Sequence, residues 1–276
     1  MPNEKFDMYA ITEIGYVRKN NEDNLYLNGA MYDIEDVNHA AFEDIPFVSP
    51  ESGEKHMNIF AVCDGMGGAE HGEIASEMAV EALSRLHKKY AEQGNNSPAE
   101  FVREYIDTAQ KSIAAERERR GAFSMGSTVV LACFKGESAF IANLGDSRAY
   151  HMRNSVLSRI SKDQTELQYM IEKGEITEEI GQDSPMANTL VKFLGMKTSE
   201  SRTASPYFGR KIDIAPRDVF LLCSDGLSGM LSEEEMGSII KKGGTAKDMC
   251  ESLVSQALAR GGHDNITVIV IKVKEA

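Results

Sequence analysis

The order of short apolar runs along the chain limits the folds that it can adopt. Eight runs contain β-branched and aromatic residues and are bounded by Gly, Asn, Asp or Ser, as strands usually are. They are Phe6–Thr12, Asn24–Leu27, Met57–Cys63, Ser127–Phe134, Ser138–Asn143, Arg148–Met152, Val219–Cys223 and Ile266–Val273. Two stretches with helical spacing of apolar residues, 73–90 and 98–119, follow the third run, and a second pair, 233–241 and 246–260, precedes the last. Strands and helices do not alternate regularly, so the order favours antiparallel sheets packed face to face with helices outside, rather than a parallel doubly wound sheet.

The chain is predicted to form a single domain over residues 1–276. No internal repeat and no linker rich in Pro, Gly or Ser divides it, and large β folds reach this length. Two stretches interrupt the pattern of runs. Residues 28–56, acidic with Gly and Pro, are expected to be a surface insertion, and residues 161–205 a mobile segment with one or two short helices.

The composition is that of an ordinary globular protein and narrows the range of partners. The formal net charge is −13, whereas nucleic acid binding usually needs an excess of Lys and Arg, so we expect no nucleic acid partner. No apolar stretch of about 18 residues and no basic-then-apolar signal peptide is present, which predicts a cytoplasmic protein without a membrane partner. The cysteines show no C-x-x-C spacing and are interpreted as buried hydrophobic residues. They are Cys63, Cys133, Cys223 and Cys250.

Four segments place acidic residues at strand ends or in a loop that enters a strand. In IFAVCDG and FLLCSDG, a mostly apolar run ends at Asp64 and at Asp225. An Asp-Gly pair in such a place can simply form a tight turn. Two carboxylates at the edge of a buried core are costly without partners, however, so they need cations nearby. Asp264 precedes the last strand, where an Asx turn is the alternative. Arg18 precedes Asp23 by five residues in a polar loop, where the alternative is a solvated ion pair.

Taken together and in order, these segments resemble the metal-dependent protein phosphatases of type 2C. The resemblance is carried by short motifs between residues 15 and 267. They are Arg18 with Glu22 and Asp23 (R-x-x-x-E-D), Asp64–Gly68 (D-G-x-x-G), Gly126–Thr128 (G-S/T-T), Gly145–Arg148 (G-D-S-R), Ser224–Gly226 (S-D-G) and Asp264–Thr267 (D-N-x-T). Each motif alone is common, but their agreement in order over nearly the whole chain is specific.

The resemblance implies an α+β fold, a four-layer α-β-β-α sandwich in which two mostly antiparallel central sheets are flanked by helix pairs. It also implies a Ser/Thr protein phosphatase from a bacterial-like, single-domain branch of the family. Its partners would be proteins phosphorylated on Ser or Thr, such as kinase substrates or a kinase, and a monomer with a role in signalling is expected.

The resemblance further implies a centre of two Mn²⁺ or Mg²⁺ ions. Asp64 would bridge both ions. Asp225 and Asp264 would complete the protein ligands of one ion, and the backbone carbonyl of Gly65 would bind the other. Oxygen ligands are the kind that these hard cations prefer. Two ions held roughly 3.5 to 4 Å apart activate a shared water molecule for attack on phosphorus.

Other residues would support this centre. By the same resemblance, Glu22 and Asp23 would act on the ions directly or through water. Asp146, together with Asp225, would share a weaker third ion. Arg18 would hold the phosphate oxygens through its planar fork, a task for which Lys is less suited.

Two positions depart from the family pattern. Met66 stands where many relatives have a His that is regarded as the acid for the leaving alcohol. Met cannot donate a proton, so a metal-bound water or another side chain must do so, and nearby His71 is interpreted as a surface residue. The flap-like segment Ser161–Gly195 is expected to influence substrate choice. It contains Asp163-Gln164 where relatives have Asp-His.

Two other functions are considered. A catalytically silent relative that binds phosphoproteins is disfavoured because Arg18, Asp64, Asp225 and Asp264 are all retained. Another hydrolase with two metal ions, such as a phosphodiesterase or nuclease, is disfavoured because the chain is acidic and has no basic patch. The glycine-rich DGMGG is not a P-loop, since it lacks G-K-S/T.

Overall fold

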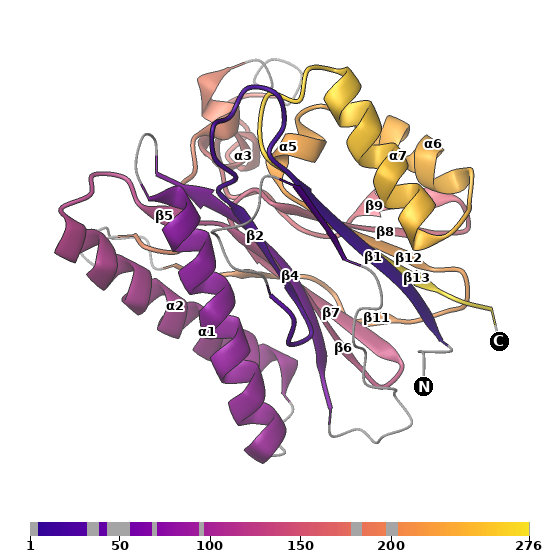
Figure 1. Cartoon of the computed structure of the whole chain (residues 1–276), viewed down its shortest axis with the longest axis horizontal. Helices are drawn as coiled ribbons and strands as arrows, with labels where there is room; N and C mark the ends of the chain where they lie inside the picture. The colour runs from indigo at the N-terminus through magenta and orange to yellow at the C-terminus, as the bar shows by residue number, and fades with distance from the viewer. Residues whose placement is uncertain are drawn as a thin grey trace.

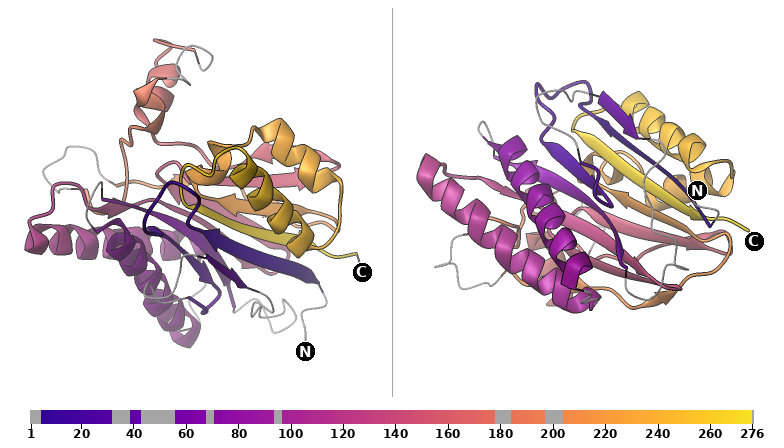
Figure 2. Two further views of the ribbon diagram at one scale, coloured as in Figure 1. Left: turned by 45° about the horizontal axis from the view of Figure 1, so that its top comes forward. Right: turned by 60° about the horizontal axis from the view of Figure 1, so that its bottom comes forward.

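The computed structural model describes residues 5–31, 39–42, 56–67, 71–93, 97–177, 184–196 and 204–275. In this part of the chain, two β-sheets lie face to face and a pair of long helices covers the outer face of each, as Figures 1 and 2 show. The expected four-layer sandwich is therefore confirmed. Every strand pairing within the two sheets is antiparallel.

The first sheet joins the two ends of the described chain. Its strand order is β3-β1-β13-β12-β8-β9. The strands are β1 (Phe6–Glu13), β3 (His39–Phe42), β8 (Arg148–Arg153), β9 (Val156–Arg159), β12 (Val219–Cys223) and β13 (Ile266–Val273). Because β1 and β13 pair over their full lengths, the loop that follows β1 lies beside the residues that precede β13.

The second sheet has the strand order β10-β7-β6-β4-β2, with β11 also paired to β7 and β5 to β4. The strands are β2 (Asp23–Leu27), β4 (Asn58–Met66), β5 (Gly126–Ser127), β6 (Val129–Lys135), β7 (Ser138–Leu144), β10 (Tyr207–Phe208) and β11 (Ile212–Asp213). The central strand β4 is buried over most of its length, which explains why its sequence is an almost continuous apolar run.

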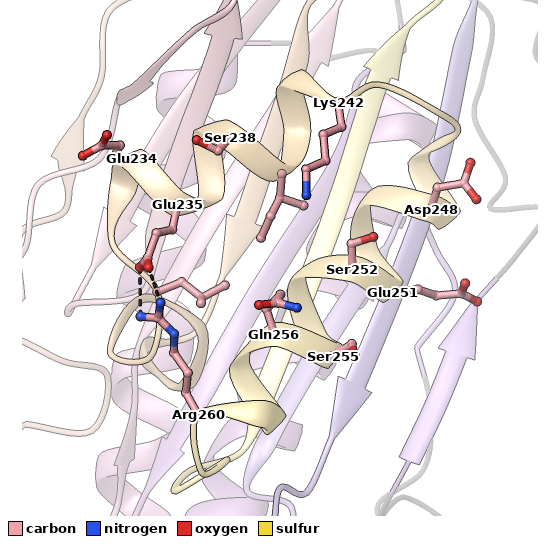
Figure 3. A pocket seen from close by; sticks show the side chains of 12 residues that line it. Glu234, Glu235, Ser238, Lys242, Asp248, Glu251, Ser252, Ser255, Gln256 and Arg260 are labelled. Carbon is pink, nitrogen blue, oxygen red and sulfur yellow. Dashed lines mark hydrogen bonds and ion pairs between the residues drawn. The ribbon is translucent and has the colours of Figure 1, made fainter.

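Helices complete the outer layers. The second sheet is covered by α1 (Gly72–Gln93) and α2 (Pro98–Arg120), and the first by α6 (Glu233–Lys241) and α7 (Ala246–Ala259). Arg260, just after α7, forms an ion pair with Glu235 of α6 across an open groove of about 690 Å³ (Figure 3). Among the helices of the described residues, none is both long and apolar enough to span a membrane.

Between the sheets, alternate residues of the strands form one core. Aromatic side chains meet across this layer, and the rings of Phe134 and Phe220 lie 5.2 Å apart with an edge-to-face geometry. The four cysteines are buried and free, as expected. One core therefore lies between the sheets, and one lies under each helix pair.

The predicted runs correspond to observed strands and helices, and the irregular stretches contain further short elements. Much of 28–56 lies outside the described residues, but its described part includes β3, which pairs with β1 at the sheet edge. Within 161–205, the described residues form α3 (Glu166–Glu172) and the 3₁₀ helix η3 (Pro185–Asn188). The left view of Figure 2 shows α3 standing away from the sheets. The sequence does not predict β9, because its two apolar residues, Val156 and Leu157, are followed by Ser158 and Arg159 and form no longer apolar run.

Candidate metal centre

The inter-sheet core ends in a polar layer. Alternate residues of a strand face the same side, so Asp23 continues the inward-facing row of Leu25 in β2, and Asp64 continues that of Val62 in β4. The two aspartates are directly opposite each other in the β2–β4 register. Two strands that are predicted separately from the sequence thus bring their carboxylates to one place.

The first sheet supplies the facing polar residues by the same alternation. Ser224 follows the inward-facing Leu222 of β12, and Thr267 precedes Ile269 of β13. The Ser224 hydroxyl donates to Asp23 Oδ2 at 2.7 Å and accepts from the backbone N–H of Thr267 at 3.0 Å. A hydrogen bond therefore joins the two sheets at the carboxylates.

Electrostatic coupling connects five of the predicted aspartates in this region. Burial raises the pKa of Asp64, and the charges of Asp23, Asp225, Asp146 and then Asp264 raise it further. Burial is also the main cause of the raised pKa of Asp23 and of Asp146. Burial, followed by the charge of Asp264, raises the pKa of Asp225 to about 6, although a hydrogen bond to Asp64 acts in the opposite direction. Such crowding of buried acids calls for cations.

Asp225 reaches the group from a short helix. It is the first residue of α5 (Asp225–Ser228), directly after β12. The next residue, Gly226, lies against the start of β13, where an added Cβ would come within 1.9 Å of the Asn265 carbonyl oxygen. This close approach places the end of β12 beside Asp264.

Asp264 forms an ion pair with Arg18. The Arg18 Nη2 donates to Asp264 Oδ2 at 2.5 Å, while Oδ1 of Asp264 accepts from the N–H of Asn265 at 2.8 Å. Both carboxylate oxygens of Asp264 are thus engaged. The side chains of Arg18 and Asp264 are 46% and 34% exposed, so the pair lies at the opening of the site rather than in its interior.

Glu22 is held next to the glycine that follows Asp64. The backbone N–H of Gly65 donates to the Glu22 carbonyl at 3.1 Å. A Cβ on Gly65 would lie 2.1 Å from the carbonyl oxygen of Gly72, and a Cβ on Gly72 would lie 2.7 Å from the Glu22 carboxyl carbon. Both glycines are needed because the chain segments approach so closely. Burial, and then the charge of Glu73, raises the pKa of Glu22.

The G-S/T-T and G-D-S-R motifs fix the backbone of Asp64. The Thr128 hydroxyl accepts from the Asp64 N–H at 3.1 Å, and the Thr128 N–H donates to the Asp64 carbonyl at 2.8 Å. Ser147 contacts the same Thr128 hydroxyl at 2.6 Å, and Ser127 donates to the Asp64 carbonyl at 3.1 Å. These motifs therefore hold a ligand candidate in position, a role that the sequence alone did not assign to Thr128.

The flap-like segment is tied to the loop that carries Asp146. Arg148 binds Asp163 through Nε at 3.0 Å and Nη2 at 2.6 Å. Gln164 and Gly145 exchange two hydrogen bonds of 3.0 Å. Asp163 and Gln164, which stand where the family has Asp-His, thus anchor the base of this segment beside Asp146.

Asn265 joins the Arg18 loop to β13, and no local pattern singles it out from the rest of its motif. Its side chain donates to the carbonyls of Ile14 and Asn20 at 3.0 Å each and accepts from the Glu22 N–H at 2.8 Å. Asn265 is 5% exposed, so these groups have little access to water. One amide therefore positions both Arg18 and Glu22.

Replacing Asn265 by Ala is expected to lower the free energy of unfolding by about 2–4 kcal/mol, because it leaves two carbonyls and one N–H without partners. Urea unfolding of the metal-free protein measures this loss. His263→Ala, at an exposed neighbouring position, is the control and should change it by less than about 0.5 kcal/mol. Equal stability of the two variants would contradict the structural role of Asn265.

The donor atoms suit a hard divalent cation, but the ligand geometry is incomplete. Within the described ranges, no three Asp, Glu, His or Cys side chains are arranged to hold one ion. The two carboxylate oxygens of Asp264 are engaged by Arg18 and Asn265. Mg²⁺ and Mn²⁺ are commonly held by few carboxylates and several waters. The oxygen donors therefore fit such ions in kind.

The sequence of this chain is similar to sequences of known proteins. A family model described as Protein phosphatase 2C matches residues 50–260. The serine/threonine phosphatase stp of Listeria monocytogenes is 32% identical over 95% of this chain and 93% of its own length.

Solved structures are also similar to this chain. A Streptococcus agalactiae serine/threonine phosphatase superposes with a TM-score of 0.78, with 26% identity over 98% of this chain and 100% of the other. The catalytic domain of the serine/threonine protein phosphatase PstP, in complex with two manganese ions, superposes with a TM-score of 0.73, also with 26% identity, and covers 98% of this chain and 99% of that one.

Proposed function

Because the chain belongs to the protein phosphatase 2C family, we propose that it hydrolyses phosphoserine and phosphothreonine in proteins with a water molecule activated at a centre of two metal ions. As a family member it is a serine/threonine protein phosphatase, and metal dependence accords with the two manganese ions bound to PstP. The following residues of this chain are proposed to perform the chemistry.

The observation that carries the proposal is the convergence of separate acidic segments at one end of the inter-sheet layer. Asp64, Asp225 and Asp264 come from β4, α5 and the loop before β13, yet a hydrogen bond to Asp64 lowers the pKa of Asp225 and the charge of Asp264 raises the pKa of both Asp64 and Asp225, whose main shift is due to burial. We assign these side chains, with the Gly65 carbonyl, as the protein ligands of two Mn²⁺ or Mg²⁺ ions. When bound, such ions polarise water for attack on phosphorus and offset the charge of the phosphate.

The neighbouring acids have supporting roles in this proposal. Asp23 and Glu22 act on the ions directly or through water, which agrees with the position of Asp23 opposite Asp64 in the register. Asp146 shares a third, weaker ion with Asp225, and the raised pKa of Asp146, due to burial and then to Asp225, supports this pairing.

Arg18 binds the phosphate of the substrate. Its guanidinium stands at the opening of the site and is partly exposed, and its planar fork suits two phosphate oxygens. It forms an ion pair with Asp264, and a substrate phosphate would take the place of that carboxylate on the guanidinium. Met66 has no proton to give to the leaving alcohol, and water is the donor that we propose.

The proposal also covers the substrates, the oligomeric state and the location of the enzyme. The substrates are phosphorylated proteins, including kinase substrates or a kinase, and the enzyme acts as a cytoplasmic monomer in signalling, as a single domain over 1–276. Substrate choice is assigned to 161–205, whose base is fixed beside Asp146 by Arg148 and Gln164. Residues 178–183 and 197–203 of that segment lie outside the described chain.

Hydrolysis of a phosphothreonine peptide tests the proposed chemistry. With Mn²⁺ we expect turnover at least about a hundredfold above that in excess chelator, because the attacking water loses its activation without the ions. A phosphotyrosine peptide and a bis-aryl phosphodiester serve as comparison substrates and should react more slowly. Undiminished hydrolysis in chelator would refute the metal-dependent mechanism, and faster cleavage of the diester would favour the phosphodiesterase alternative.

A further inference from the structure

A second cavity lies at the opposite end of the first sheet from the carboxylates. It has a volume of about 570 Å³ and is formed by the β8–β9 turn, the turn before β12, the end of α6, Met249 of α7 and the end of β13. In Figure 1 this is the end of β13 that leads to the marked C-terminus. We call it the terminal cavity. Its volume is within the usual range for small-molecule sites, about 300–1,000 Å³.

The terminal cavity carries an excess of positive charge. The lysines and arginines that line it are Arg153, Arg217, Lys241, Lys272 and Lys274, and the acids are Asp218 and Glu275. The lining therefore has a surplus of three positive charges, although the whole chain has a net charge of −13. A basic cavity in so acidic a protein selects anions over cations.

Both acids of the lining are already paired with its arginines. Asp218 is 1% exposed and accepts from Arg153 Nε at 2.8 Å and Nη2 at 2.6 Å. Glu275 pairs with Arg217. Neither Lys241 nor Lys272 is paired with these two acids, and the Nζ of Lys272 donates to the backbone carbonyl of Gly244.

The backbone holds Arg217 in a position that is unusual for its residue type. Arg217 has φ +69°, in the left-handed region, and its N–H donates to the carbonyl of Val273 at 2.9 Å. A residue other than Gly in this region costs on the order of 1 kcal/mol or more and persists where the surroundings impose it. The backbone of Arg217 is therefore held in place beside the end of β13, while its side chain is largely exposed at the rim.

Apolar side chains form part of the floor of the terminal cavity. Met152, Val219, Ile240, Met249 and Val273 lie there with exposures of 6% or less, and polar residues such as Asn154 and Ser155 complete the lining. A small apolar floor beneath a cationic rim suits a ligand that has a small apolar body and an anionic group. A phosphate monoester carries a charge of about −1.5 to −2 at pH 7, which matches the surplus of the rim better than a single carboxylate does.

We propose that the terminal cavity binds a small organic phosphate, with the phosphate at Lys241 and Lys272 and the apolar body against Ile240 and Met249. The site is separate from the proposed metal centre. It lies at the far ends of β12 and β13, the strands that lead to Asp225 and from Asp264.

Phenyl phosphate, in excess chelator, is the probe for this site. Backbone amide NMR of the full chain should show shifts at Asn154, Arg217 and Lys272, and calorimetry should give a dissociation constant. Lys241→Gln/Lys272→Gln should weaken binding by about tenfold or more, because two charge-assisted contacts are lost. The matched control Lys88→Gln/Lys111→Gln, on exposed positions of α1 and α2, should leave it unchanged.

Three results would overturn the proposal. One is a set of amide shifts confined to Arg18 and its neighbours. Another is equal affinity of the two double variants for phenyl phosphate, and the third is equal binding of phenol, which has the same ring without the anion. None of these readouts depends on bound metal or on turnover, so their failure leaves the proposed phosphatase chemistry untouched.

Discussion

Asp225→Asn is expected to reduce hydrolysis of a phosphothreonine peptide by roughly a thousandfold or more in saturating Mn²⁺. Asp225 is assigned to the ions, and an amide there provides neither the charge nor the second anionic oxygen of a carboxylate. Loss of a group that helps to activate water and to stabilise charge in the transition state typically lowers the reaction rate by about this factor. Steady-state kinetics over a series of Mn²⁺ concentrations separates weaker metal binding from slower turnover.

The same substitution should stabilise the metal-free protein. The pKa of Asp225 is raised to about 6 in the folded state, chiefly by burial and then by Asp264, and lies near 4 in an unfolded chain. Between these values the folded state binds more protons, so stability falls as the pH rises from about 4 to 6 and stays lower above that. The difference is on the order of 3 kcal/mol. Denaturant unfolding in chelator at pH 4.5 and pH 7.5 should show this loss in the wild type and a smaller loss in Asp225→Asn.

Asp107→Asn provides the matched control for both measurements. Asp107 lies on the exposed face of α2, where it pairs with Lys111 at 2.7 Å, and such exposed pairs contribute little. This variant should keep wild-type turnover and the wild-type dependence of stability on pH. If Asp225→Asn retained turnover like that of the control, Asp225 would not be a metal ligand.

The sandwich could be predicted because the local signals agree with the final packing. Runs such as Phe220–Leu222 have apolar residues on both faces. One face is covered by helices and the other by the second sheet, so the runs indicate buried strands. By contrast, β9 and the short strands β10 and β11 contain exposed residues. They form because a neighbouring strand offers free hydrogen-bonding groups, which their own sequences do not reveal.

The predicted aspartates lie close enough to raise one another's pKa, but the residues that position them were not foreseen in those roles. Asn265 acts on Ile14, which is 251 residues away in the sequence, and Thr128 acts on Asp64 across the β4–β5 junction. Their partners are backbone groups, and any sequence offers those everywhere, so no local pattern identifies the contact. The Arg18–Asp264 ion pair was not predicted for a different reason: each residue has a plausible local partner or turn of its own.

Gly65→Ala is expected to lower the free energy of unfolding by more than about 4 kcal/mol, or to prevent folding, because the new Cβ would lie 2.1 Å from the Gly72 carbonyl oxygen and 2.5 Å from that of Glu22. Both of these atoms belong to backbone, and neither can move without shifting β2 or the start of α1. Soluble yield and denaturant unfolding measure the effect.

A second glycine shows whether this effect belongs to the site. Gly237 is inside α6, and the nearest atom to an added Cβ, Leu157 Cβ, lies at 3.4 Å, an ordinary contact. Gly237→Ala should therefore keep the fold and raise stability by up to about 1 kcal/mol, since Ala favours helices over Gly. If Gly65→Ala were as stable as Gly237→Ala, Glu22 and the residues after Asp64 could not be packed as closely as the structure has them. The backbone carbonyl assigned to one ion would then lose its fixed position beside Asp64.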